Sequence, residues 1–220
     1  MTMFPVVNAM KAWLEGEEVL PLGKQIDSFG QTYRNYRLTW STTKSHDLLR
    51  SINLHEERHA FIKRYCFAVP TFEAITLLGK ASPLIEIGAG SGAWTRLMCN
   101  RGIDVIATDP GLESFHFKIG EWHPVVDLQG KTAVRRWPDR NVFCSWPSLC
   151  HTWLRQAARA MRPGRKLIVV REDATADERT WDYIEDAFHL VEVQELLTFG
   201  TCHDQLEVWV KQPTHRRTST

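Results

Sequence analysis

Long hydrophobic runs are missing from this sequence. No uninterrupted apolar stretch reaches the roughly 20 residues that a helix needs to span a bilayer. A basic segment followed by a long apolar run is also missing near Met1, so no secretory signal is indicated. We therefore expect a cytoplasmic protein with no membrane partner.

An excess of charge of either sign is missing too. Lys and Arg number 27 against 26 Asp and Glu, which leaves a net charge of +1. This balance excludes a chain that binds nucleic acid through its overall charge, while a local basic patch stays possible. With 220 residues, 43% hydrophobic and 24% charged, the sequence is typical of one sizeable globular domain with or without a small cap.

Cysteine is scarce, and no Cys-x-x-Cys pair occurs. The five cysteines are odd in number and widely spaced. That pattern indicates free, mostly buried thiols in a reducing compartment rather than a disulfide framework. We expect no metal site.

Apolar runs alternate with helical patterns from about residue 83. Strands are predicted at 83–87, 104–109, 125–127, 141–146 and 166–170, and closing runs at 191–199 and 205–211. Helices are predicted from Thr71, at 93–101, at about 149–161 and at about 176–188. The alternation predicts parallel strands with right-handed crossovers, and the short loop between the last two runs predicts an antiparallel hairpin. The fold class is therefore α/β: a doubly wound, mostly parallel seven-stranded sheet with a C-terminal antiparallel hairpin, plus an N-terminal helical cap.

The ends of the chain are harder to interpret. Residues 33–40 favour an edge strand or extended arm, 45–52 a short helix and 55–65 a charged helix. We divide the chain into a cap at 1–70 on the substrate side, a main domain at 71–211 and a flexible tail at 212–220. Between Asp109 and Asn141 the chain is short for helix, strand and helix, so one of those helices is expected to be reduced to a turn.

A glycine-rich turn follows the first predicted strand. In the stretch from Glu86 to Gly92, every second residue from Gly88 onward is glycine. Without Cβ atoms the backbone can turn tightly there, and a ligand can approach the free N–H groups of the following helix. The spacing of Gly88, Gly90 and Ala93 also satisfies the loose dinucleotide-binding fingerprint, so the glycine turn alone is compatible with NAD as the ligand.

The fuller pattern Glu-x-Gly-x-Gly-x-Gly resembles motif I of class I S-adenosylmethionine-dependent methyltransferases. Asp109 after the second strand, Ser145-Trp146-Pro147-Ser148 after the fourth, the Arg162-Pro163-Gly164 turn and the closing hairpin follow in that family's order. The resemblance covers roughly residues 60–211. It implies S-adenosylmethionine as cofactor, with Glu86 near the methionine amino group, the glycines under the methionine and ribose, and Asp109 accepting from the ribose hydroxyls. Asp127 either bonds the adenine amino group or faces water. The implied cofactor-binding set is Glu86, Gly88, Ala89, Gly90, Ser91, Gly92, Asp109, Pro110, Asp127, Ser145 and Trp146.

The acceptor side is less defined. Ser145-Trp146-Pro147-Ser148 partly resembles the Asp/Asn-Pro-Pro-Tyr/Phe motif of amino-methyltransferases, with Ser145 in the polar position and Trp146 offering a stacking face; the alternative is a packed strand-end turn. No general base stands out, and His123, His151 and His203 are weak candidates because they lie near predicted loops. Tyr65, Phe67 and Pro70 either close on the methionine end or pack in the core.

Two further signals are weighed. His55 to His59 fits the zinc-protease pattern His-Glu-x-x-His, but both intervening residues are charged and no third ligand stands out, so a solvated helix face is favoured. Two groups of arginines predict either a local nucleic-acid surface or a solvated face. These are Arg155, Arg159 and Arg162, and Arg135, Arg136 and Arg140.

The sequence thus predicts an S-adenosylmethionine-dependent methyltransferase. Two alternatives stay open: a non-catalytic cofactor-binding interaction protein and an NAD(P)-dependent oxidoreductase. The methyl acceptor (small molecule, protein or nucleic acid) and the oligomeric state are left undetermined.

Overall fold

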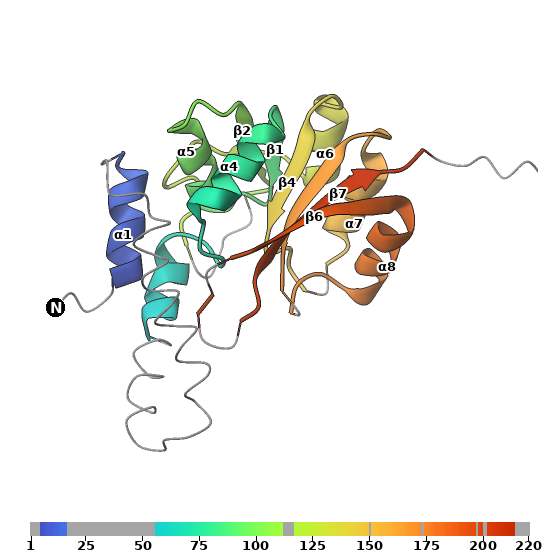
Figure 1. The fold of residues 1–220 in the computed structure, drawn as a ribbon. Coiled ribbons are helices and arrows are strands. Elements are labelled where there is room, and N and C mark those ends of the chain that lie inside the picture. Colours follow the sequence, from blue (N-terminus) through green and yellow to red (C-terminus); the bar gives the residue numbers. More distant parts are fainter. Residues whose placement is uncertain are drawn as a thin grey trace, which may run out of the picture.

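A computed structural model describes residues 5–16, 56–111, 117–149, 151–172, 174–196, 198–199 and 202–213. Its seven-stranded sheet has the order β3-β2-β1-β4-β5-β7-β6 (Figure 1). The strands are β1 (Leu84–Ile87), β2 (Val105–Asp109), β3 (Val126–Asp127), β4 (Asn141–Ser145), β5 (Lys166–Arg171), β6 (Phe188–Glu195) and β7 (Gln205–Lys211). The labelled helices are α1 (Pro5–Leu14), α4 (Phe72–Lys80), α5 (Ala93–Cys99), α6 (Gly130–Arg136), α7 (Trp153–Ala160) and α8 (Glu178–Ala187). Residues 56–64 are helical as well.

The strand directions confirm the predicted fold class. Strands β3, β2, β1, β4 and β5 pair in parallel, while β7 runs antiparallel between β5 and β6. Dinucleotide-binding sheets of the 3-2-1-4-5-6 order lack this reversed strand. Because the carboxyl ends of β1 to β5 meet at one edge, the turns that follow those strands are brought together there.

Helices cover both faces of the sheet (Figure 1). Alternate side chains of each strand point to opposite faces, so Leu84 and Phe143 belong to one core and Ile85 and Val142 to the other. The first core is closed by α1, α4, α5 and the helix at 56–64, and the second by α6, α7 and α8. The carboxyl edge therefore lies between two packed layers.

Local sequence signals set several element ends as predicted. The Thr71 hydroxyl accepts a hydrogen bond from Ala74 N–H at 3.2 Å, which caps the start of α4. After α5, Gly102 has a φ of +70° and its N–H donates to Cys99 O at 2.9 Å. That left-handed backbone ends the helix because glycine adopts it without steric cost.

Three boundaries differ from the expectation by three residues or more. Helix α7 begins at Trp153 rather than about residue 149, and β6 spans Phe188–Glu195 rather than 191–199. Phe188 is both the C-cap of α8 and the first residue of β6, with φ −130° and ψ 160°. No loop separates helix from strand, so no turn residue marks the boundary. Between β2 and α6 the described residues form no helix, which agrees with the expected reduction.

A helical cap was predicted within residues 1–70, but the bounds of the amino-terminal helix α1 were not. Its first turn is held from outside: Glu57 Oε1 accepts a hydrogen bond from Val6 N–H at 2.6 Å, and Tyr65 donates to Val7 O at 3.0 Å. At its other end Arg96 donates to Leu14 O at 3.3 Å. The predictions for 33–40, 45–52 and most of the tail lie outside the described residues.

Among the residues that the structure describes, no helix is both long and apolar enough to cross a bilayer. The four described cysteines are free thiols: Cys66 and Cys144 are buried, Cys99 and Cys202 half-buried.

Candidate functional site

The glycine turn joins β1 to α5 at the carboxyl edge of the sheet. Gly88, Gly90 and Gly92 have φ values of +70°, +53° and +77°. All three lie in the left-handed region, which other residues adopt only with strain. The turn is tied to β2 by Ala89 N–H, which donates to Thr108 O at 3.1 Å. The sequence therefore uses glycine here for backbone shape as well as for close approach.

Two carboxylates lie beside this turn, at the ends of neighbouring strands. Asp109 and Asp127 face each other in the register of β2 and β3. The N–H of Gly90 donates to Asp109 Oδ2 at 3.1 Å. Burial raises the pKa of Asp109, although hydrogen bonds from Gly90 and Gly111 oppose the shift and the charge of Asp127 adds to it. Pro110 next to them is exposed. Predicted cofactor residues thus converge into one half-exposed, acceptor-rich edge.

Glu86 lies inside the protein, only 1% exposed. Its Oε2 accepts a hydrogen bond from the Thr95 hydroxyl on α5. Burial raises its pKa to about 8, against the opposing effect of that hydrogen bond. Glu86 is therefore mostly protonated near pH 7, and a cation brought close to it would favour the charged form.

Aromatic rings pack against the glycine turn, and nothing in the sequence indicated this packing. A Cβ placed on Gly90 would lie 2.2 Å from Phe117 Cε2, and one on Gly88 would lie 3.0 Å from Trp153 Cη2. The segment after Phe117 also bonds to the turn: Gly120 N–H donates to Gly90 O and Trp122 N–H to Ser91 O, each at 2.9 Å. Part of the surface beside the glycines is therefore covered by this chain's own residues.

Ser91 has a structural role. Its hydroxyl donates to Tyr65 O and accepts from Ala93 N–H at 3.3 Å. Ala89 is buried. Both residues shape the turn, and Ser91 links it to the segment after the helix at 56–64.

The turn after β4 holds Trp146 in an uncommon backbone conformation, with φ +54°. Its ring stacks on Phe67 with centroids 5.2 Å apart and planes 9° apart, and Arg58 lies 5.7 Å from its ring centre. Its Nε1–H donates to Asp204 at 2.6 Å. A non-glycine residue with positive φ costs free energy, and such strain clusters at functional sites. The stacking face predicted for Trp146 is occupied by Phe67.

Ser145, the last residue of β4, has a buried hydroxyl oxygen with no hydrogen-bond partner among the described residues. Leaving such a group unpaired costs about 1–3 kcal/mol.

The histidine candidates do not gather at one point. His203 and His151 are exposed, and the main chain of His123 lies against Gly92. The buried titratable group in this region is instead Asp204, next to His203. Burial raises its pKa to about 6, while the hydrogen bond from Trp146 opposes the shift.

Within the described residues, no group of three His, Cys, Asp or Glu is placed to hold a metal ion. His55, the first residue of the zinc-protease pattern, lies outside the described residues. Glu57 within that pattern is buried and bonded to α1. The preference for a non-metal role stays a prediction.

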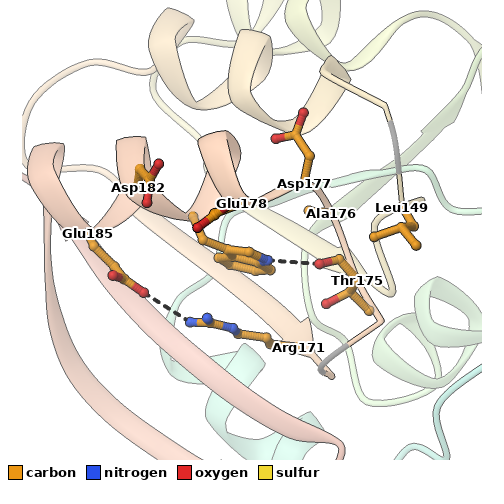
Figure 2. A pocket seen from close by; sticks show the side chains of 9 residues that line it. Leu149, Arg171, Thr175, Ala176, Asp177, Glu178, Asp182 and Glu185 are labelled. Atoms are coloured by element: carbon orange, nitrogen blue, oxygen red, sulfur yellow. Dashed lines mark hydrogen bonds and ion pairs between the residues drawn. The ribbon is translucent and has the colours of Figure 1, made fainter.

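A separate cavity of about 570 Å³ opens at the end of β5, beside α8 (Figure 2). Arg171 forms an ion pair with Glu185 at 3.3 Å (Figure 2). The Trp181 indole donates a hydrogen bond to Thr175 O at 2.8 Å. The cavity is next to the Ser145 turn, since Ala176 N–H donates to Pro147 O at 2.9 Å. None of its lining residues belongs to the glycine turn.

The motif resemblance implies a sheet with a reversed closing strand, and the order β3-β2-β1-β4-β5-β7-β6 with antiparallel β7 agrees with that expectation. No family model and no curated protein matches the sequence. Three similar solved structures are the glycopeptide N-methyltransferase MtfA complexed with S-adenosylhomocysteine, the N-methyltransferase NodS from Bradyrhizobium japonicum and an rRNA methylase from Streptococcus thermophilus. Their identities are 12%, 13% and 13%, and their TM-scores 0.42, 0.38 and 0.39. The matches cover 64%, 73% and 63% of this chain and 89%, 97% and 94% of the others. Likeness at this level does not assign an activity, which has to come from the chain's own residues.

Proposed function

We propose that this chain binds S-adenosylmethionine at the glycine turn and transfers its methyl group to an acceptor. The observation that carries the proposal is the pair of carboxylates at adjacent strand ends, with Asp109 bonded to Gly90 N–H at 3.1 Å. A carboxylate offers two acceptor oxygens, which suits the two hydroxyls of a ribose. Asp127, paired with Asp109 one strand further out, is the acceptor we propose for the amino group of an adjoining base.

The residues present fit the adenosine part of the cofactor better than the methionine part. Asp127 is exposed and Asp109 half-buried, whereas Phe117 lies on Gly90. The methionine arm therefore requires the Phe117 ring to move. Glu86 supports the position of that arm, because a buried carboxyl with a pKa of about 8 gains the most from a nearby ammonium group.

The cofactor supplies an activated methyl group, and the protein's task is to align a nucleophile behind it. Ser145 is suited to orient an acceptor, since its buried hydroxyl has no partner in the described part of the chain. Trp146 and Asp204 hold the turn that carries it. A proton leaving the acceptor has Asp204 within the same cluster, with a pKa of about 6.

Calorimetric titration tests the cofactor assignment. We expect wild-type protein to bind S-adenosylhomocysteine and not NAD, and Asp109→Asn to weaken binding by about 10–100-fold through loss of a charged acceptor. Asp139→Asn is the matched control, because Asp139 is an exposed aspartate paired with Arg162 on the far edge. Its affinity should equal that of wild type.

NAD binding without S-adenosylhomocysteine binding would overturn the proposal in favour of an oxidoreductase. If S-adenosylhomocysteine binds, transfer of a labelled methyl group from S-adenosylmethionine into cell fractions tests whether the protein is an enzyme. Binding without any labelled product would favour a non-catalytic cofactor-binding protein.

A further inference from the structure

The structure brings together two groups of basic residues that are separated in the sequence. Lys131, Arg135 and Arg136 lie on α6, and Arg155 and Arg159 on α7. The two helices pack on the same face of the sheet, so closely that a Cβ on Gly130 would lie 3.6 Å from Ala157 Cβ. We call the surface formed by these five side chains the α6–α7 face (helices in Figure 1).

The two helices of this face carry no acidic residue, and acidic side chains lie on the neighbouring helix α8. The sequences of α6 and α7 are GKTAVRR and WLRQAARA, without Asp or Glu. No described carboxylate lies within ion-pair distance of the five cations, whereas the neighbouring Arg140 and Arg162 are paired with Asp104 and Asp139 at 2.7 Å. Near Arg155, the pKa of exposed Asp177 is lowered, chiefly by its hydrogen bond with Thr180 and less by Arg155. In a chain whose net charge is +1, this concentration of charge is local.

Helix stability explains only part of the pattern. Arg135, Arg136 and Arg159 stand in last turns, where the helix dipole favours cations. Lys131 and Arg155 stand in first turns, where the dipole opposes them. Their positions cost stability in the free protein, which is expected if an anionic partner compensates.

The outward side chains indicate which polyanion fits. The remaining exposed positions of the two helices are polar, as at Thr132 and Gln156, and neither helix presents a large exposed hydrophobic side chain. Membrane-surface helices insert apolar side chains, and these helices have none to insert. Rows of arginine over two adjacent helices instead match the regularly spaced charges of a phosphodiester backbone.

We propose that the α6–α7 face binds the backbone of a nucleic acid without reading its sequence. This inference does not rest on the proposed methyltransferase activity. Five cation–phosphate contacts to a single strand give a slope of about −3.5 for log K against log salt, so affinity should fall about 100-fold between 50 and 200 mM salt.

Fluorescence anisotropy with a labelled 20-nucleotide single-stranded RNA of mixed sequence tests the proposal in the absence of cofactor. Arg135→Glu/Arg155→Glu changes one residue on each helix, and neither arginine makes an ion pair or a ring contact with another described residue. We expect a loss of about 60-fold or more at 50 mM salt, from two phosphate contacts at roughly 8-fold each. Lys63→Glu/Lys80→Glu is the control, because it changes the net charge equally with two exposed lysines outside this face. It should change affinity less than about 3-fold.

Absence of RNA binding at 50 mM salt would overturn the proposal, as would an equal loss in both double variants, since that loss reports net charge only. Binding to vesicles of phosphatidylserine and phosphatidylcholine but not to RNA would show that the face is a membrane surface instead. Calorimetry with S-adenosylhomocysteine on the same variants separates the two proposals, since their cofactor affinity should be unchanged.

Discussion

The contact between Gly90 and Phe117 allows a quantitative test of how the turn is built. Gly90→Ala has two costs: a left-handed backbone at a residue with a Cβ, about 1–2 kcal/mol, and overpacking against the Phe117 ring, about 1–3 kcal/mol. The first follows from the φ of +53° and the second from the 2.2 Å approach to Cε2. We expect the free energy of unfolding to fall by about 2–5 kcal/mol.

A double-mutant cycle separates these two costs. In a Phe117→Ala background the ring is gone, so Gly90→Ala should cost only the backbone part, about 1–2 kcal/mol. Gly102→Ala is the matched control, since its φ is +70° but nothing lies within 4 Å of the added Cβ. It should cost about 1–2 kcal/mol in both backgrounds.

Urea unfolding followed by tryptophan fluorescence measures all five variants and the wild type, because the chain has nine tryptophans. Equal costs of Gly90→Ala with and without the Phe117 ring would refute the reasoning, since they would mean that the ring does not lie on the turn.

Three other outcomes follow from the site. Phe117→Ala alone should bind S-adenosylhomocysteine about 2–10-fold more tightly than wild type, as measured by calorimetry. In the wild type the Phe117 ring has to leave its contact with Phe67 before the ligand binds, which costs about 0.5–1.5 kcal/mol. Weaker binding by the variant would mean that the ring supports the cofactor. The free energy of unfolding should fall as pH rises from about 5 to 8, because Glu86 has a pKa of about 8 in the folded protein but ionises near 4.5 in the unfolded chain. Glu86→Gln should flatten the dependence of the urea midpoint on pH between about 5.5 and 8.5. An unchanged slope would contradict a buried neutral Glu86. Trp146→Phe should lower the free energy of unfolding by about 1–3 kcal/mol at pH 7.5, because it removes the hydrogen bond to Asp204. The loss should be smaller at pH 5, where Asp204 with its pKa of about 6 is mostly neutral. Equal losses at both pH values would count against the Trp146–Asp204 hydrogen bond.

Local signals were enough to predict the sheet and the turn. The strand ending at Ile87, the glycines, and Asp109 at the next strand end are short-range patterns, and the parallel topology follows from their alternation with helices. The cap at Thr71 and the stop at Gly102 were predictable for the same reason, since each depends on a few neighbouring residues.

What the sequence did not reveal depends on contacts between distant residues. Helix α1 is held by Glu57, 51 positions further along the chain from Val6, and no pattern within 5–14 indicates that contact. The rings that contact the glycines come from residues far along the chain. Phe117 lies 27 residues after Gly90, and Trp153, the first residue of α7, lies 65 residues after Gly88. Asp204 becomes a notable titratable group only because the fold buries it beside Trp146.

Hydrogen–deuterium exchange with and without S-adenosylhomocysteine tests the central claim most directly, because it locates the cofactor on the chain. We predict slower exchange in 86–92 and 105–111, where the glycine turn and Asp109 lie, and unchanged exchange in α8 (178–187). No protection at saturating ligand, or protection confined to α8 and the cavity beside it, would contradict a cofactor site at the glycine turn.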